Sequence, residues 1–162
     1  RSLSMIGKQL GGVLPQPGAF TPEDKTILAA ADGMIGSARE HMKTQQLHQV
    51  LNAVWAVVAD ANRYFASEAP WAKTKTDPQR QGTILYVTAE VLRQVAILAQ
   101  PFVPASAGKL LDLLAVGADE RQFDKLGSRI KPPGREVTFR DRGASRSMGR
   151  GTSSTNRWPG ST

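Results

Sequence analysis

The chain contains no cysteine among its 162 residues. This absence excludes disulfide bonds, thiolate metal ligands and a cysteine nucleophile, and it fits the reducing cytoplasm, where we expect the protein to be located. Long apolar runs are missing as well, since a run such as Val54 to Ala59 falls far short of the about 20 residues that a membrane-spanning helix needs. We therefore expect no membrane partner.

Groups that could carry catalysis or bind a metal are scarce. The two histidines, His41 and His48, could share a helix face, but residues 44–46 are expected to interrupt that helix, and no third ligand accompanies them. The serines have no neighbouring base, and the glycines form no phosphate-binding loop. The sequence predicts no catalytic residue, no metal site and no cofactor within this chain.

No segment alternates apolar and polar residues with a period of two, so strands are not expected. Apolar residues recur instead at helical spacing, and Thr21-Pro22 and Asp77-Pro78 each pair a capping side chain with a proline at the first helical position. Gly33 and Gly36 interrupt the first helical segment and indicate close packing there. The helical segments span residues 22–42, 46–67, 78–100 and 107–114. They predict an all-α antiparallel helical bundle over residues 21–126.

Residues 1–20 precede this bundle. Leu3, Ile6 and Leu10 have the spacing of the last turns of a helix, and the two prolines and three glycines of residues 11–20 predict a loop. Because the chain also begins without methionine, we expect it to be the C-terminal piece of a longer protein.

Residues 127–162 form the last predicted unit, a disordered tail. From residue 135 on, six arginines face two acids, so this stretch supplies +4 of the net charge of +7. So few of its residues are hydrophobic that burial cannot offset the entropy of ordering. Three interpretations remain open: a solvated tail, an Arg-Gly segment that binds RNA without sequence preference, or the product of a reading-frame error. The rest of the chain is only mildly basic.

The tripeptide Ala69-Pro70-Trp71 directly follows a helical segment that ends in Asn62-Arg63-Tyr64-Phe65. A tryptophan held by a preceding proline offers a flat, stiff face on which an unpaired base of single-stranded nucleic acid can stack. The alternative is that Trp71 caps a hydrophobic core.

Polar side chains near the same helix end are further candidates. Arg63, Lys73 and Lys75 could neutralise backbone phosphates, although surface cations are more often simply solvated. Asn62 could contact RNA, or it could hydrogen-bond to nearby backbone and fix the turn that presents Trp71.

Four stretches together resemble the anticodon-binding domain of bacterial methionyl-tRNA synthetases. They are residues 1–6, 62–65, 69–71 and 92–104, and the resemblance covers residues 1–126. The leucine-rich helix that ends in Pro-x-x-Pro is shared with the valine, leucine and isoleucine enzymes. Asn-x-Tyr followed closely by Pro-Trp is more typical of the methionine enzyme.

The resemblance implies a helix bundle on the C-terminal side of a class I catalytic domain, which grips the CAU anticodon of tRNA(Met). It implies that Trp71 stacks on the anticodon, that Pro70 shapes the turn, and that Arg1 reads the first anticodon base together with an asparagine just before residue 1. ATP and Mg²⁺ belong to the catalytic domain, whose nucleotide-binding motifs this chain lacks, so the chain alone is not expected to activate methionine. The implied partners are the tRNA anticodon loop and the catalytic domain, and not DNA.

The end of the chain departs from the family pattern. Residues 131–135 begin like the proline-rich ending of family members, and the sequence diverges from Thr138 on, which fits a shifted reading frame, a gene remnant or a cloning artefact. Two other functions stay open: the equivalent domain of a valine, isoleucine or leucine enzyme, and a helical protein-interaction domain with Trp55, Trp71 and Phe102 as anchors. An exposed surface shared by Trp71 and Arg1 would favour RNA binding over the interaction domain.

Overall fold

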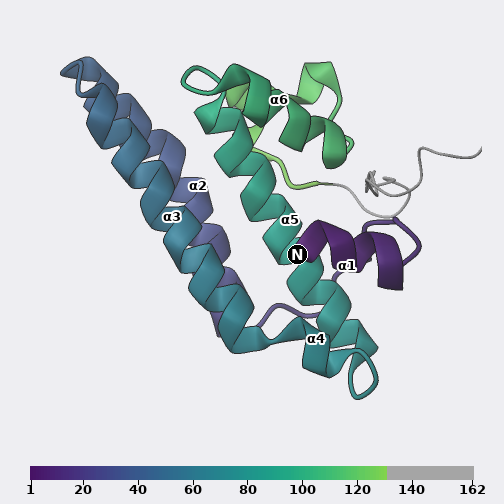
Figure 1. The fold of residues 1–162 in the computed structure, drawn as a ribbon. Coiled ribbons are helices and arrows are strands. Elements are labelled where there is room, and N and C mark those ends of the chain that lie inside the picture. The colour runs from purple at the N-terminus through teal and green to yellow at the C-terminus, as the bar shows by residue number, and fades with distance from the viewer. Residues whose placement is uncertain (131–162) are drawn as a thin grey trace, which may run out of the picture.

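The computed structural model describes residues 1–130 and consists of helices joined by loops (Figure 1). Within these residues no strand occurs, so the predicted all-α fold is confirmed. The predicted disorder of the tail concerns mainly residues 131–162, which lie outside the described part. The helices are α1 (Ser2–Gln9), α2 (Pro22–Lys43), α3 (Leu47–Glu68), α4 (Pro70–Lys73), α5 (Pro78–Ala99) and α6 (Pro104–Leu113), followed by the 3₁₀ turns η1 (Ala118–Glu120) and η2 (Phe123–Gly127).

Capping side chains fix the starts of the two helices that the sequence marked most clearly. At the start of α2, the Thr21 amide donates to Asp24 Oδ2 at 3.0 Å and the Asp24 amide donates to Thr21 Oγ1 at 3.4 Å, which makes a capping box. At the start of α5, the Arg80 amide donates to Asp77 Oδ1 at 2.9 Å. Both helices begin with a proline, as predicted.

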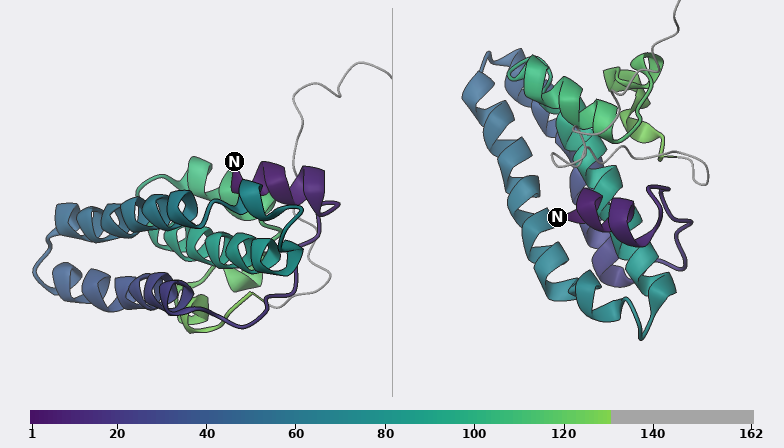
Figure 2. Two further views of the ribbon diagram at one scale, coloured as in Figure 1. Left: turned by 90° about the horizontal axis from the view of Figure 1, so that it is seen from below. Right: turned by 45° about the vertical axis from the view of Figure 1, so that its right-hand side comes forward.

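Helix α5 is the centre of the fold. It packs against α1, α2, α3, α4, α6 and η2. Helix α1 lies against α5, and the N-terminus of the chain is at the start of α1 (Figures 1 and 2). Helices α2 and α3 form an antiparallel hairpin beside it. The length and apolar composition of α5 would suit a membrane span, but nearly all of the helix is buried by its neighbours, as is typical of the core helix of a bundle.

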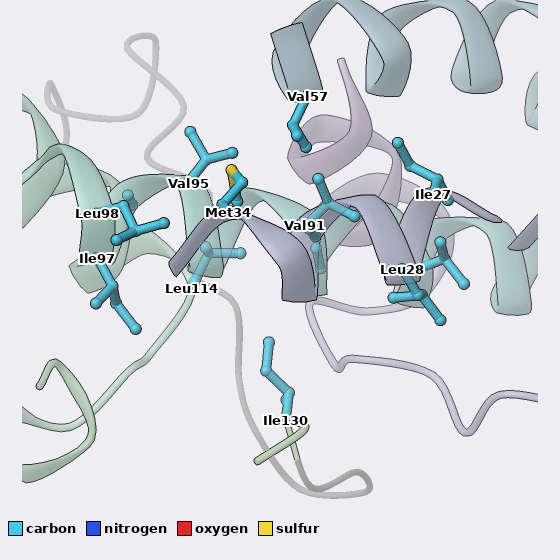
Figure 3. Packing of buried hydrophobic residues seen from close by; sticks show 14 of the residues in the cluster. Ile27, Leu28, Met34, Val57, Val91, Val95, Ile97, Leu98, Leu114 and Ile130 are labelled. Carbon is cyan, nitrogen blue, oxygen red and sulfur yellow. The ribbon is translucent and has the colours of Figure 1, made fainter. Parts of the chain in front are cut away.

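The hydrophobic core joins this central helix to the hairpin and to the end of the described chain. Figure 3 shows Met34 of α2, Val57 of α3 and Val91 of α5 in this cluster, with Ile130 below them. Ile130 is only 3% exposed, and its carbonyl accepts a 2.8 Å hydrogen bond from the Tyr86 hydroxyl. The packed chain therefore extends at least to residue 130. The predicted boundary at 127 was placed too early, because Gly-Ser-Arg-Ile has no periodic pattern.

Two details of the predicted packing are wrong. Met42 and Leu47 continue the apolar helical spacing of their segments, which predicts that both are buried, but they lie near the tip of the hairpin and are 50% and 51% exposed. Gly33 and Gly36 make no close approach, since a methyl group added at either would meet nothing within 4 Å among the described residues. The close packing expected at these glycines is absent from that part of the chain.

Candidate nucleic-acid interface

A cavity of about 510 Å³ lies between the start of α1, the second half of α3, α4 and the middle of α5. Three of the predicted site residues, Arg1, Asn62 and Trp71, line it together, although Arg1 is about 60 to 70 residues away from the other two in the sequence. Among residues 1–130, no acidic side chain lines it, and Arg1 is its one charged residue. The other lining residues are Ser2, Leu3, Val58, Ala61, Phe65, Ala66, Thr88, Val91, Leu92 and Val95.

Trp71 is 50% exposed, so it does not cap the core. Its indole meets the ring of Phe65 edge-on, with centroids 5.9 Å apart and an interplanar angle of 60°. This contact, of a kind that contributes about 0.5–1.5 kcal/mol, holds the indole while half of its surface remains accessible. The ring is therefore available for stacking with a flat ligand.

The backbone before Trp71 is unusual. Ala69 ends α3 in the left-handed conformation, at φ 42° and ψ 60°, and its amide donates to the Phe65 carbonyl at 3.2 Å. A side chain in this region costs roughly 1–2 kcal/mol. Pro70 is buried and begins α4, so Trp71 lies in the first turn of a short helix rather than in an open turn. Pro70 does not line the cavity; it shapes the backbone that presents Trp71.

Asn62 and Arg1 present polar groups from two other sides of the cavity. Asn62 is exposed on α3, and within residues 1–130 its side chain makes no hydrogen bond. The alternative that Asn62 fixes the turn is thus not supported. Arg1 is exposed at the N-cap of α1, and its carbonyl accepts the Met5 amide at 3.0 Å. An amide and a guanidinium are suited to pairing with base edges.

The candidate phosphate contacts lie elsewhere. Arg63 forms an ion pair with Asp60 and lines a different cavity, of about 470 Å³, toward the start of α2. Lys73 is half-buried at the end of α4 and Lys75 is exposed just beyond it, both outside the cavity that holds Trp71. The structure brings none of these three cations into the cavity.

A buried polar network lies behind this site, and sequence reasoning missed it. The carboxylate of Asp24 accepts a 2.5 Å hydrogen bond from the Tyr64 hydroxyl and a 3.0 Å bond from Arg80 Nη2. Arg80 also forms an ion pair with Glu68 at 2.9 Å. The network joins the start of α2, the end of α3 and the start of α5. In the sequence, Asp24 lies in the first turn of a helical segment, and no pattern indicates its partners.

Protonation in this network follows from its contacts. Burial alone raises the pKa of Asp24, but hydrogen bonds from Arg80 and Tyr64 outweigh it, so the carboxyl pKa lies below its usual value. Burial and the bond to Asp24 raise the pKa of Tyr64, and the bond to Asp24 raises the pKa of Arg80. The network therefore holds Asp24 ionised, Tyr64 neutral and Arg80 charged.

Among residues 1–130, no group of three or more His, Asp or Glu side chains could hold a metal ion. The described residues that line the cavity offer it an indole, a side-chain amide and a guanidinium, which suit stacking, hydrogen bonding and attraction of negative charge.

An all-helical bundle with a half-exposed tryptophan, an asparagine and an arginine around one acid-free cavity has the features of a helical RNA-binding domain. Residues 14–138 match the model of the family described as the anticodon-binding domain of methionyl tRNA ligase. The chain belongs to this family. Because the family is that of the methionine enzyme, neither the sister enzymes nor a protein-interaction domain is favoured.

Similarity to individual proteins agrees with this family assignment. The chain is 63% identical over 131 residues to methionine–tRNA ligase of Brucella suis and 61% identical over 127 residues to that of Rhizobium meliloti. These matches cover 80% and 78% of this chain but 25% of each relative. The chain thus spans about a quarter of their length.

Solved structures give the same result in three dimensions. Methionyl-tRNA synthetase of Mycobacterium tuberculosis, in a crystal structure with methionyl-adenylate bound, superposes with a TM-score of 0.82 at 43% sequence identity. The match covers 85% of this chain and 28% of that chain.

Proposed function

We propose that this domain binds the anticodon loop of tRNA(Met) and recognises the CAU anticodon. In this proposal, Trp71 stacks on an unpaired base, and Arg1 and Asn62 pair with base edges. The observation that carries the proposal is the cavity that these three residues share. Half of the indole surface is accessible there, and none of the lining residues from the described part of the chain is an acid that would repel RNA.

The physical chemistry of the cavity suits this role. Its volume of about 510 Å³ lies within the range of roughly 300–1,000 Å³ that is common for small-ligand pockets. Stacking of a base on an aromatic side chain contributes about 1–3 kcal/mol and tolerates any base. Discrimination between bases therefore depends on the polar groups, and a guanidinium can donate two parallel hydrogen bonds to the acceptor atoms of cytosine.

Membership of this family also indicates what kind of longer protein the domain belongs to. We infer that this domain follows a catalytic domain that joins methionine to tRNA, the reaction that the relatives' names state. We further infer that ATP and Mg²⁺ serve that catalytic domain. This chain would then contribute tRNA recognition and no chemistry of its own. We place the protein in the cytoplasm, where tRNA is aminoacylated.

Replacing Trp71 tests the proposal directly. The Trp71→Ala variant should weaken binding of a CAU anticodon stem-loop by about 1–3 kcal/mol, because it loses one stacked base. The fold should remain intact, since the indole is half-exposed. Binding is measured by fluorescence anisotropy of labelled RNA at two stated salt concentrations, with a UAU loop for comparison.

Trp55 provides the matched control. It is 52% exposed on α3 and does not line the cavity, so Trp55→Ala should leave CAU binding unchanged. Equal, salt-sensitive binding of both loops, unaffected by Trp71→Ala, would contradict anticodon recognition. It would instead assign RNA binding to the positive charge of residues 135–162.

A further inference from the structure

The first turn of α5 carries Arg80 and Gln81, whose contacts hold both ends of the segment that bears Trp71. We call these two residues the α5 clamp. Neither lines the cavity. We propose that the α5 clamp positions Trp71 for RNA binding, which rests on the function proposed above and adds two positioning residues to it.

Arg80 holds the chain just before Trp71. Its guanidinium pairs at 2.9 Å with Glu68, the last residue of α3, and Glu68 immediately precedes the left-handed Ala69. The same guanidinium binds Asp24 at the start of α2. The side chains of Arg80 and Glu68 are only 14% and 16% exposed, so solvent and salt screen their attraction weakly. The end of α3 is thereby fixed to two other helices.

Gln81 holds the chain just after Trp71. Its side chain is buried, and its Nε2 donates to Thr74 Oγ1 and to Gln9 Oε1, each at 2.8 Å. The Thr74 hydroxyl in turn donates to the Trp71 carbonyl at 3.1 Å. Gln9 is the last residue of α1, the helix that begins beside Arg1. Gln81 thus links the backbone of Trp71 to the helix that bears the second predicted RNA contact.

Helix α4 needs such external contacts. It has four residues, whereas isolated helices are marginal below about 12–15 residues. It also begins after Ala69, whose left-handed backbone is strained and persists only where surrounding contacts hold it. The backbone of α4 alone therefore does not fix the position of Trp71. Stacking is strongest when the ring is ordered before the base arrives, because ordering it on binding costs affinity. The contacts of the α5 clamp on both sides of α4 supply that order.

Glu68→Gln gives the sharpest test, because an electrostatic role and an anchoring role of Glu68 predict opposite changes in RNA affinity. Removing a negative charge beside an RNA site should strengthen binding if the effect is only electrostatic. If Glu68 serves to anchor the end of α3, the same change should weaken binding. Gln81→Met is the companion variant, since it removes the Thr74 and Gln9 contacts without changing charge.

Both variants are made in the full chain, with and without Trp71→Ala, and their affinity for the labelled CAU stem-loop is measured at one salt concentration. Each should weaken binding roughly three- to tenfold when Trp71 is present and have no effect in the Trp71→Ala background. Glu40→Gln is the matched control. It breaks an exposed ion pair with Lys43 at the end of α2 and should leave binding unchanged.

A second measurement follows Trp71 without RNA. The double replacement Trp55→Phe and Trp158→Phe leaves Trp71 as the only tryptophan. In that background, Glu68→Gln and Gln81→Met should lower the fluorescence anisotropy of the indole and increase its quenching by acrylamide. Circular dichroism checks that each variant keeps its helices.

Three outcomes would contradict the proposed role of the α5 clamp. The first is tighter RNA binding by Glu68→Gln, and the second is a loss of affinity in Glu68→Gln and Gln81→Met that is as large with Trp71→Ala as without it. The third is that neither variant changes the mobility of the Trp71 indole. Failure of the proposed function looks different. In that case Trp71→Ala leaves RNA binding intact, while the fluorescence of the sole Trp71 still responds to Glu68→Gln.

Discussion

Tyr64 illustrates at the scale of one residue how a buried charge makes a hydrogen bond strong. Its hydroxyl donates to the carboxylate of Asp24, whereas Tyr86, which is also buried, donates to the neutral carbonyl of Ile130. Hydrogen bonds to charged groups contribute about 1.5–3 kcal/mol, and neutral ones about 0.5–1.5 kcal/mol. The two tyrosines therefore form a natural pair for comparison.

Tyr64→Phe should lower the free energy of unfolding by about 1.5–3 kcal/mol, because Asp24 loses one of its donors. Tyr86→Phe, the control, should cost about 0.5–1.5 kcal/mol. Urea unfolding followed by circular dichroism measures both. Equal losses would show that the charge of Asp24 adds nothing to the bond.

The same carboxylate makes stability depend on pH. The folded pKa of Asp24 is lowered, so the unfolded chain, in which an aspartate has a pKa of about 3.9, binds the proton first. The contribution of Asp24 should be fully present above about pH 4 and be lost as the pH falls through the folded pKa. Unfolding free energies measured from acid to neutral pH should show this decline in the wild type. The decline should be shallower in Asp24→Asn, and parallel profiles would refute the assignment.

At the scale of elements, the junction between α3 and α4 stores strain that the neighbouring contacts balance. Ala69→Gly should relieve the left-handed backbone, which costs an alanine about 1–2 kcal/mol, while a glycine adds about 0.4–1 kcal/mol of unfolded-state entropy. We expect a net gain in stability of between about 0 and 1.6 kcal/mol by chemical denaturation.

Ala115 supplies the control for this change. It follows α6 with a positive φ of 54° and lies away from Trp71, so Ala115→Gly should give a similar gain. A loss of stability in Ala69→Gly, with a gain in Ala115→Gly, would mean that the alanine side chain at residue 69 makes contacts that outweigh its strain.

At the scale of the whole molecule, residues 127–130 belong to the folded domain. Ile130 is buried, its amide donates to the fully buried Glu90 at 3.1 Å, and the Ser128 carbonyl accepts from Arg93 at 2.6 Å. Arg129 reaches across to form an ion pair with Asp32 of α2. This last segment thus covers the buried Glu90–Arg93 pair.

A chain ending at residue 126 should therefore be less stable than one ending at residue 134 by about 3 kcal/mol or more. Loss of Ile130 burial alone accounts for about 1.5–3 kcal/mol, and the buried Glu90 and Arg93 each lose a hydrogen-bond partner. Thermal unfolding of the two shortened chains measures the difference. Identical midpoints would restore the boundary at 127.

Local signals predicted much of this fold and part of the site. The capping pairs at Thr21 and Asp77 marked the starts of α2 and α5, because a cap involves residues only three positions apart. The Pro70-Trp71 pair indicated an exposed aromatic ring. Long-range partners left no such trace: nothing near Asp24 in the sequence points to Arg80, which is 56 residues away. The boundary at 127 failed for the same reason.

The sequence by itself determined the helical class, the family and, to within one residue, the limits of α2, α3 and α5, since these depend on periodicity and short motifs. It missed α4 and placed the start of α6 three residues late. Only the tertiary structure decided that Arg1, Asn62 and Trp71 surround one cavity, because each comes from a different helix and only packing around α5 brings those helices together. It also decided that Arg63 lines another cavity, toward the start of α2, and that Arg80 and Gln81 contact the two ends of the segment that bears Trp71. Such contacts depend on where side chains meet in space, and the order of residues along the chain does not specify this locally.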